Sequence, residues 1–233
     1  MGSACASSKG AEVKGDQLAQ LPREDRQAII DQEKSVDVAK ANVDAARVAA
    51  KQAHEFKDLV DNEVTAAKAE RDAADNSTSY TNSKQSQADL NAKRQVAAQK
   101  VAAAESKAEY ANKLIDVREA EVGEREAEVD LAQARLDRAK YETLRQRGLG
   151  QDINQQNIID AEREAEQKRA EAHQKVAQSQ GYADASKGNW NKAQEQWQAS
   201  AKSTQADDRP VQPPAAAKYL QQPQVKEHSN PNP

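Results

Sequence analysis

The chain has 233 residues, of which 37% are hydrophobic and 31% charged, with 34 basic against 38 acidic side chains and a net charge of -4. A compact domain of this length would need more large apolar side chains to offset its conformational entropy, whereas a long helix needs only a narrow apolar seam. The mixed charge provides no basic stripe for nucleic acid, and no apolar run reaches the roughly 18 residues of a membrane span. The composition therefore favours a protein built of long helices, and argues against a compact globular domain, a nucleic-acid-binding protein or a membrane-spanning protein.

The single cysteine stands near the start of the sequence, in Met1-Gly2-Ser3-Ala4-Cys5. Ser3-Ala4-Cys5 resembles the end of a bacterial lipobox, in which small residues precede the cysteine that becomes the lipid-bearing N-terminus. Gly2 stands where that pattern has Leu, and we expect a short Met-Gly leader in place of a signal peptide. The resemblance implies that Cys5 is lipidated, that residues 1–22 are a flexible tether and, since no Asp follows Cys5, that the anchor lies in the outer membrane. The alternative is an incidental thiol in a cytosolic protein.

A first helix is predicted over residues 23–74, after Pro22, which suits the first turn of a helix. Its apolar residues recur in steps of seven along two rails, as in a coiled-coil seam. The rails are Ile29, Val36, Val43, Ala50 and Val64, and Ala39, Ala46, Ala53, Val60, Ala67 and Ala74. Polar residues over 75–83, whose side chains compete for backbone hydrogen bonds, then interrupt the pattern. We interpret them as a turn between two helices, the alternative being a polar stretch within one continuous helix.

A second helix is predicted over residues 83–147. Its rails are Val101, Ala108, Ile115, Val122, Val129, Leu136 and Thr143, and Ala104, Ala111, Arg118, Arg125, Ala132 and Ala139. A strict seven-residue repeat of this length implies supercoiling against another helix. Gly148-Leu149-Gly150 ends the helix, because glycine adopts the backbone conformation that commonly terminates helices.

A third helix is predicted over residues 154–180, capped by Asp152 or Asn154. Its seam is Ile153, Ile158, Ala161, Ala165, Ala172 and Val176. Gly181 and Gly188 predict a break, followed by a short helix over 190–202. Residues 203–233 are predicted to be a disordered tail, because they contain Pro210, Pro213, Pro214, Pro223, Pro231 and Pro233.

Residues 129–180 resemble the α-hairpin of periplasmic adaptor (membrane-fusion) proteins, whose tip docks onto the coiled-coil end of an outer-membrane channel. The family signature is an Arg, a Leu four residues later, and a Ser where the return helix begins. Here Leu144 matches the Leu, while Lys140 replaces the Arg and Asn154 replaces the Ser out of register. The flanking β-domains of an adaptor have no counterpart in the pattern. The resemblance implies a hairpin tip formed by Leu144, Leu149 and Ile153.

Trp190 and Trp197 are seven residues apart and therefore share one face of a helix. One hypothesis is that they clamp the last helix onto the bundle. The other is that they are exposed and anchor a protein partner, since aromatic residues dominate interface energies.

The histidines His54, His173 and His228 are far apart, and none has a second His or Cys at the spacing of a metal site. Gly148-x-Gly150 lacks the preceding strand and third glycine of a phosphate-binding loop. We therefore expect no catalytic residues, metal, cofactor or small-molecule substrate.

Together these patterns predict an all-α protein: a long antiparallel coiled-coil bundle of two or three helices over 23–202, with a short C-terminal helix and disordered ends. The function expected is that of a non-enzymatic, Ala-rich bacterial envelope lipoprotein. It would act as a periplasmic helical spacer or scaffold on the outer membrane, binding an envelope protein or a second copy through its coiled coil. The alternatives are a hairpin adaptor that docks onto an outer-membrane channel or secretion component, and a cytosolic coiled-coil scaffold.

Overall fold

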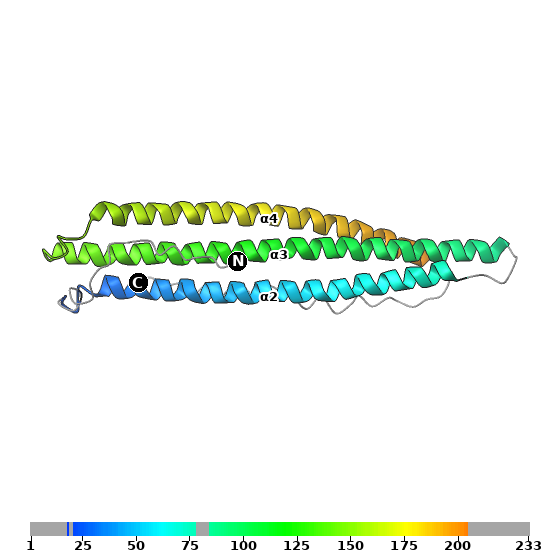
Figure 1. Ribbon diagram of the computed structural model, residues 1–233, viewed down its shortest axis with the longest axis horizontal. Coiled ribbons are helices and arrows are strands. Elements are labelled where there is room, and N and C mark those ends of the chain that lie inside the picture. The colour runs from blue at the N-terminus through cyan, green and yellow to red at the C-terminus, as the bar shows by residue number, and fades with distance from the viewer. Residues whose placement is uncertain (1–17, 19–20, 78–83, 205–233) are drawn as a thin grey trace, which may run out of the picture. The chain divides into compact units, whose positions relative to one another are not determined.

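The computed structural model describes residue 18 and residues 21–77 and 84–204. Its elements are three long α-helices, α2 (Gln27–Asn76), α3 (Lys84–Gln146) and α4 (Gln155–Thr204), and the described residues contain no strand (Figure 1). The longest, α3, has 63 residues, which at a rise of about 1.5 Å per residue gives a helix of roughly 95 Å. The all-α prediction is confirmed. Cys5 and the Pro-rich tail from 205 onward lie outside the described residues.

The helices divide between two compact units. Unit 1 comprises Met1–Ala53 and Glu109–Asn189, and unit 2 comprises His54–Ala108 and Trp190–Pro233. Each of the three helices therefore contributes one segment to each unit.

Ion pairs between helices show that neighbours run antiparallel in both units. In unit 1, the α3 residues Glu128 and Arg138 pair with Arg169 and Glu162 of α4, so the partner's number falls as the α3 number rises. In unit 2, Lys100 and Lys107 of α3 pair with Glu70 and Glu63 of α2 in the same sense. The predicted antiparallel arrangement is confirmed within each unit.

The predicted seam of α2 is confirmed. Its buried members are Ile29, Val36, Ala39, Val43, Ala53, Val60 and Ala67. The predicted start at residue 23 is wrong, because residues 23–26 form a turn instead. Successive backbone hydrogen bonds there span three residues, from Asp25 N to Pro22 O and from Gln27 N to Glu24 O, and the α-helix begins only at Gln27.

The predicted main seam of α3 is only partly correct. Val101, Leu136 and Thr143 are buried, but the rungs between them, from Ala108 to Val129, are half-buried. The deepest rail lies two residues later and reads Ala103, Tyr110, Val117, Glu124 and Leu131. The reason is that α3 packs against both α2 and α4, so its most enclosed positions lie between two seams. An alanine-rich heptad pattern does not distinguish these positions.

The predicted break near Gly181 and Gly188 is wrong, and so is the separate helix over 190–202: α4 is continuous to Thr204. Side chains that are buried or half-buried keep the alternating three- and four-residue spacing of a seam through both glycines: Val176, Ser179, Ala183, Ser186, Trp190 and Ala193. A glycine in a helix costs only about 1 kcal/mol relative to alanine. Continuous packing along the seam outweighs that cost.

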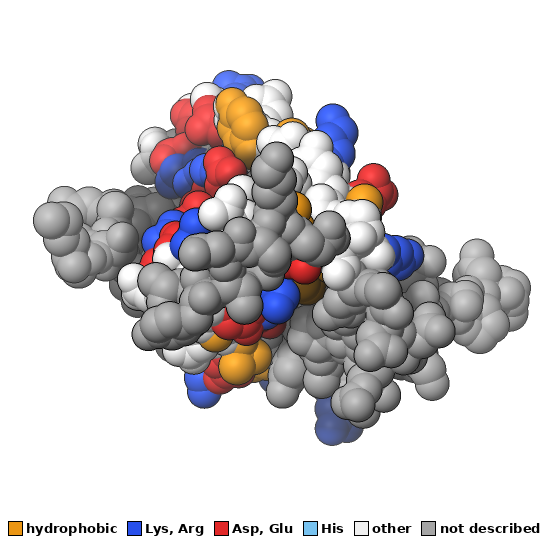
Figure 2. All heavy atoms as spheres, turned by 90° about the vertical axis from the view of Figure 1, so that its right-hand side faces the viewer, with side chains coloured by type: hydrophobic (Ala, Val, Ile, Leu, Met, Phe, Trp, Pro, Cys, Tyr) orange, Lys and Arg blue, Asp and Glu red, His pale blue; other side chains and the backbone are white. Residues whose placement is uncertain are grey.

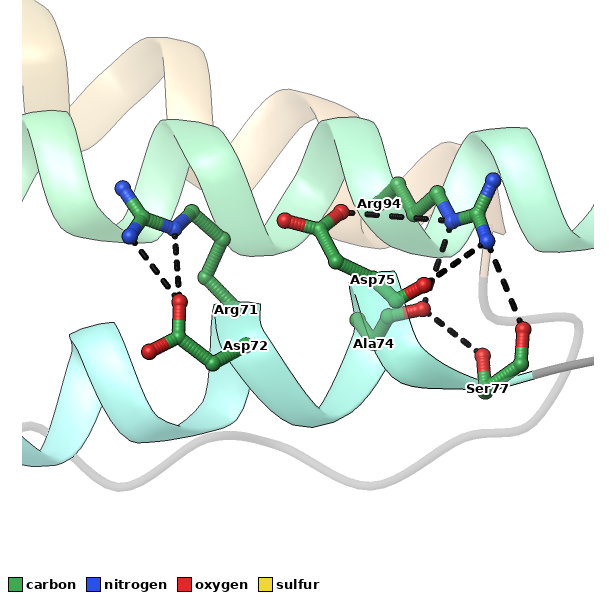
Figure 3. Close-up of polar contacts among 6 residues, drawn as sticks. All are labelled: Arg71, Asp72, Ala74, Asp75, Ser77 and Arg94. Carbon is green, nitrogen blue, oxygen red and sulfur yellow. Dashed lines mark hydrogen bonds and ion pairs between the residues drawn. The ribbon is translucent and has the colours of Figure 1, made fainter.

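Helix α2 ends at Asn76, and α3 begins at Lys84. Of the predicted turn over 75–83, the structure describes residues 75–77, and α2 ends within them. Residues 78–83 lie outside the described residues. Figure 3 shows how α3 closes this end: the Arg94 guanidinium donates to the carbonyl oxygens of Ala74, Asp75 and Ser77 at 3.3, 2.9 and 3.4 Å. Since α2 has no basic residue in its last turn, Arg94 supplies the cation that a helix C-terminus favours.

Candidate functional site

The turn between α3 and α4, in unit 1, is the first candidate site. The backbone N–H of Leu149 donates to Leu144 O at 2.9 Å and that of Gly148 donates to Arg145 O at 3.0 Å. With Gly148 at φ 73°, this is a Schellman motif, which satisfies the carbonyl groups at the end of a helix. The sequence prediction that glycine ends α3 here is explained by this geometry.

The return helix begins at a defined cap. Gly150 also has φ 73°, and the Asn154 side-chain oxygen accepts a hydrogen bond from Gln156 N at 2.9 Å. This is the N-cap interaction, in which a side chain satisfies a free N–H of the first turn. Of the two predicted caps, the structure shows Asn154 in this role.

The three residues predicted to form the hairpin tip are brought together, but they do not form a free apolar tip. They belong to a hydrophobic cluster, here called the turn cluster, made of Leu18, Leu21, Ile29, Val36, Ala132, Leu136, Leu144, Leu149 and Ile153. Leu144 is fully buried, with 0% of its surface exposed, and Leu149 and Ile153 are half-buried. A partner would therefore have to displace part of this cluster to reach Leu144.

An ion pair fastens the same region to the segment that precedes α2. The Arg147 guanidinium donates to both carboxylate oxygens of Asp25, at 2.6 and 2.8 Å. This hydrogen bond holds the pKa of Asp25 below its usual range and raises that of Arg147. We call Leu18 and residues 21–26 the N-terminal clasp, because both its leucines and Asp25 contact the turn. The clasp and the turn are far apart along the chain, and no sequence pattern connects them.

The tryptophans, in unit 2, are the second candidate site. Trp190 packs against the ammonium group of Lys107, which lies 5.8 Å from the ring centroid and also 5.8 Å from that of Phe56. Lys107 Nζ pairs with Glu63 at 2.6 Å, and the Lys107 side chain is only 7% exposed. One lysine of α3 thus contacts two residues of α2 and one of α4.

The arrangement repeats seven residues away. Lys100 Nζ lies 5.9 Å from the Trp197 ring centroid and donates to Glu70 Oε1 at 2.6 Å. We call the two sets, Lys107 with Phe56, Glu63 and Trp190, and Lys100 with Glu70 and Trp197, the lysine layers. Both tryptophans are half-buried, and their contacts are those of a clamp between helices.

The roles of Lys100, Lys107, Phe56 and Glu63 were missed by sequence analysis. A signal was present: two lysines seven residues apart on one helix match two tryptophans seven residues apart on another. This spacing does not indicate, however, which of the many lysines point between helices rather than to solvent. Lys140, which replaces the adaptor Arg, is half-buried.

Among the residues that the structure describes, no three His, Cys, Asp or Glu side chains gather in a way that could hold a metal ion. Over the same residues, no helix is both long and apolar enough to cross a bilayer. Chemically, the turn cluster and the lysine layers can hold helices together.

Comparisons with protein-family models, curated proteins and solved structures find no match to this chain.

Proposed function

We propose that this protein is a non-catalytic bacterial envelope lipoprotein that acts as a helical spacer or scaffold for protein–protein interaction on the periplasmic face of the outer membrane. The observation that carries the proposal is how the apolar and aromatic side chains are used. In both units they lie mostly between the protein's own helices, in the α2 seam, the turn cluster and the lysine layers. The rest of the described surface, on helices of 50 to 63 residues, is mainly charged and polar, although it also exposes large apolar side chains such as Val38, Val48 and Tyr182.

The outer surface supports a spacer rather than a site for one charged ligand. Figure 2 shows acidic and basic side chains interspersed over the described part of the face that it presents, without a region of one sign. Many of the protein's charges pair along one helix, as Lys168 does with Glu164 and Arg138 with Glu142. Such pairs support a solvent-exposed helix by a few tenths of a kcal/mol each.

The lipid anchor that we propose at Cys5 fits the position of the clasp. The chain from Cys5 to Leu18 spans at most about 45 Å, at roughly 3.5 Å per residue. Leu18 packs in the turn cluster, so a lipid on Cys5 would keep the α3–α4 turn within that distance of the membrane. The clasp would then connect the anchor to the helices of unit 1.

The test is lipidation of the protein expressed from its native gene, including the codons upstream of the sequence. We expect the wild type to incorporate radiolabelled palmitate and to sediment with outer membranes, and Cys5→Ser to lose both properties. Ser8→Ala is the matched control and should behave as the wild type. Sedimentation of Cys5→Ser as strong as that of the wild type would contradict the anchor and favour the cytosolic alternative.

The hairpin-adaptor alternative has less support from the geometry. It needs an apolar tip that is free to dock, whereas Leu144 is buried and Leu149 and Ile153 pack against the turn cluster. We therefore propose the scaffold, in which the turn serves the protein's own packing.

A further inference from the structure

Helix α2 carries most of the large apolar side chains that are exposed. Of the five such side chains among the described residues, four lie on α2: Ile30, Val38, Val48 and Leu59. In unit 1, Val38 and Val48 are 61% and 57% exposed, and Ala41 and Ala45, which lie between them, are exposed as well. We call Val38, Ala41, Ala45 and Val48 the outer stripe.

The outer stripe has the spacing of a coiled-coil seam. Its members follow one another by three, four and three residues, as apolar residues do where two helices pack together. Each member stands two residues after a member of the α2 seam, which here comprises Val36, Ala39, Val43 and Ala46. Two residues correspond to a rotation of roughly 200° about the helix axis. The α2 seam packs within the protein, so the outer stripe lies on the opposite face of α2.

The outer stripe is also palindromic, because it reads Val, Ala, Ala, Val in both directions with the same spacing. A two-fold axis level with residue 43 would therefore bring Val38 opposite Val48 of a second copy, and Ala41 opposite Ala45. Large residues then meet large ones and small residues meet small ones. A surface that matches itself in this way is what a two-fold symmetric dimer requires.

The charges beside the outer stripe favour the same arrangement. Asp37, Asp44 and Lys51 recur in steps of seven along one edge of it, where charged side chains pair across coiled coils. The two-fold axis brings Asp37 of each copy opposite Lys51 of the other, which gives two ion pairs. Asp44 would face its own copy near the axis, and Arg47, 4.0 Å from Asp44 on the same helix, provides a counter-charge there.

We propose that the outer stripe binds a second copy of this chain, with the two α2 helices antiparallel about that axis. In a parallel pair, Asp37 and Lys51 would instead come opposite Asn42 and Phe56, which carry no charge. By naming the partner, the proposal deepens the scaffold function proposed above and rests on it, although the dimer itself needs no lipid. The seam is short, so the dimer should dissociate on dilution.

The first experiment is sedimentation velocity of the full chain over a series of concentrations. All proteins carry Cys5→Ser, which removes the only thiol and so prevents dimers linked by a disulfide bond. This parent protein should change from monomer to dimer as its concentration rises. Adding Val38→Glu and Val48→Glu together should weaken association by about 100-fold, because the new carboxylates would lose their hydration in the seam.

Both valines are exposed, so this variant should fold, and circular dichroism checks that it does. Tyr182→Glu is the matched control: Tyr182 lies on α4 and is 58% exposed, and the variant should dimerise as the parent does. A parent that stays monomeric at its highest soluble concentration would overturn the proposal. The same holds if the double valine variant dimerises as strongly as the parent.

The second experiment tests the orientation by exchanging charges. Asp37→Lys and Lys51→Asp should each weaken association by about tenfold, because each places like charges opposite one another at two positions. An equimolar mixture of the two variants should associate as tightly as the parent, since opposite charges then meet at both positions. A mixture that associates no more tightly than either variant alone would overturn the antiparallel dimer. None of these outcomes affects the test of lipidation, which uses the native precursor.

Discussion

The turn cluster and the lysine layers hold helices together by different means. The turn cluster in unit 1 consists of aliphatic side chains, of which Leu144 and Ile153 lie against Gly150, a glycine with positive φ. The lysine layers in unit 2 place ammonium groups beside aromatic rings and carboxylates. In a chain with few large apolar residues, seven of the fifteen leucines and isoleucines that the structure describes belong to the turn cluster. Long polar side chains contribute in the lysine layers, where helices only lie alongside one another.

The two regions differ in composition because a chain reversal and a side-by-side helix contact place different demands on packing. A chain reversal needs a sharply defined packing arrangement, which close-packed aliphatic side chains provide. Alanine seams, by contrast, bury little area in each layer. A lysine can increase the buried area of such a seam, because its apolar stem covers an aromatic ring while its ammonium group stays paired with a carboxylate. Substitutions in the two regions should therefore have effects of different size and different chemical dependence.

The largest effect is expected for Leu144→Ala in the turn cluster. Because Leu144 is fully buried, its truncation should lower the free energy of unfolding by about 3 to 5 kcal/mol, as a lost apolar contact plus a cavity. Urea denaturation measures this change. Val38→Ala is the control, since Val38 on α2 is 61% exposed and its truncation should cost less than about 0.5 kcal/mol. Equal losses in the two variants would mean that the turn cluster is not a core.

Two substitutions of Lys107 should show whether the volume of its side chain or its charge contributes more to stability in the lysine layers. Lys107→Ala should lower the free energy of unfolding by about 1 to 3 kcal/mol, because it removes the buried stem and the contact with two rings. Lys107→Met keeps a chain of similar volume, and Glu63, whose side chain is 36% exposed, can regain water. We expect Lys107→Met to cost less than about 1.5 kcal/mol. A loss as large as that of Lys107→Ala would show instead that the charge carries the contact.

Replacing glycine with alanine should lower the stability of the protein at the turn and raise it within α4. Gly148→Ala should destabilise the protein by about 1 to 2 kcal/mol, because φ is 73° there, in the left-handed region that disfavours a Cβ. Gly181→Ala and Gly188→Ala should each stabilise by about 0.4 to 1 kcal/mol, since a Cβ at either position meets nothing within 4 Å and alanine favours helix. Thermal unfolding of the three variants tests the contrast. Destabilisation by Gly181→Ala would argue against a continuous α4.

The helices and their antiparallel order could be predicted from the sequence, because heptad spacing and glycine positions report local structure. The α2 seam, from Ile29 to Ala67, illustrates this success. The break at Gly181 could not be judged locally, since it depends on tertiary packing on either side of the glycine. The environments of Lys107 and Leu144 could not be predicted either, because each depends on residues of distant segments, Phe56 and Trp190 for one and Leu21 for the other.

The smallest effect is expected at the ion pair of the N-terminal clasp, where the groups are exposed to water and salt. Hydrogen bonding to Arg147 lowers the pKa of Asp25, so the pair contributes stability above the ordinary range of aspartate and loses it as the pH falls through the lowered pKa. In Arg147→Gln, the carboxyl resonance of Asp25 should titrate at higher pH than in the wild type. The melting temperatures of the two proteins should differ above about pH 5 and converge in stronger acid.

Arg163→Gln is the control: Arg163 lies 3.7 Å from Asp160 on an exposed face of α4, and its loss should leave the Asp25 titration unchanged. An Asp25 titration that is the same with and without Arg147 would mean that the clasp is held by Leu18 and Leu21 alone.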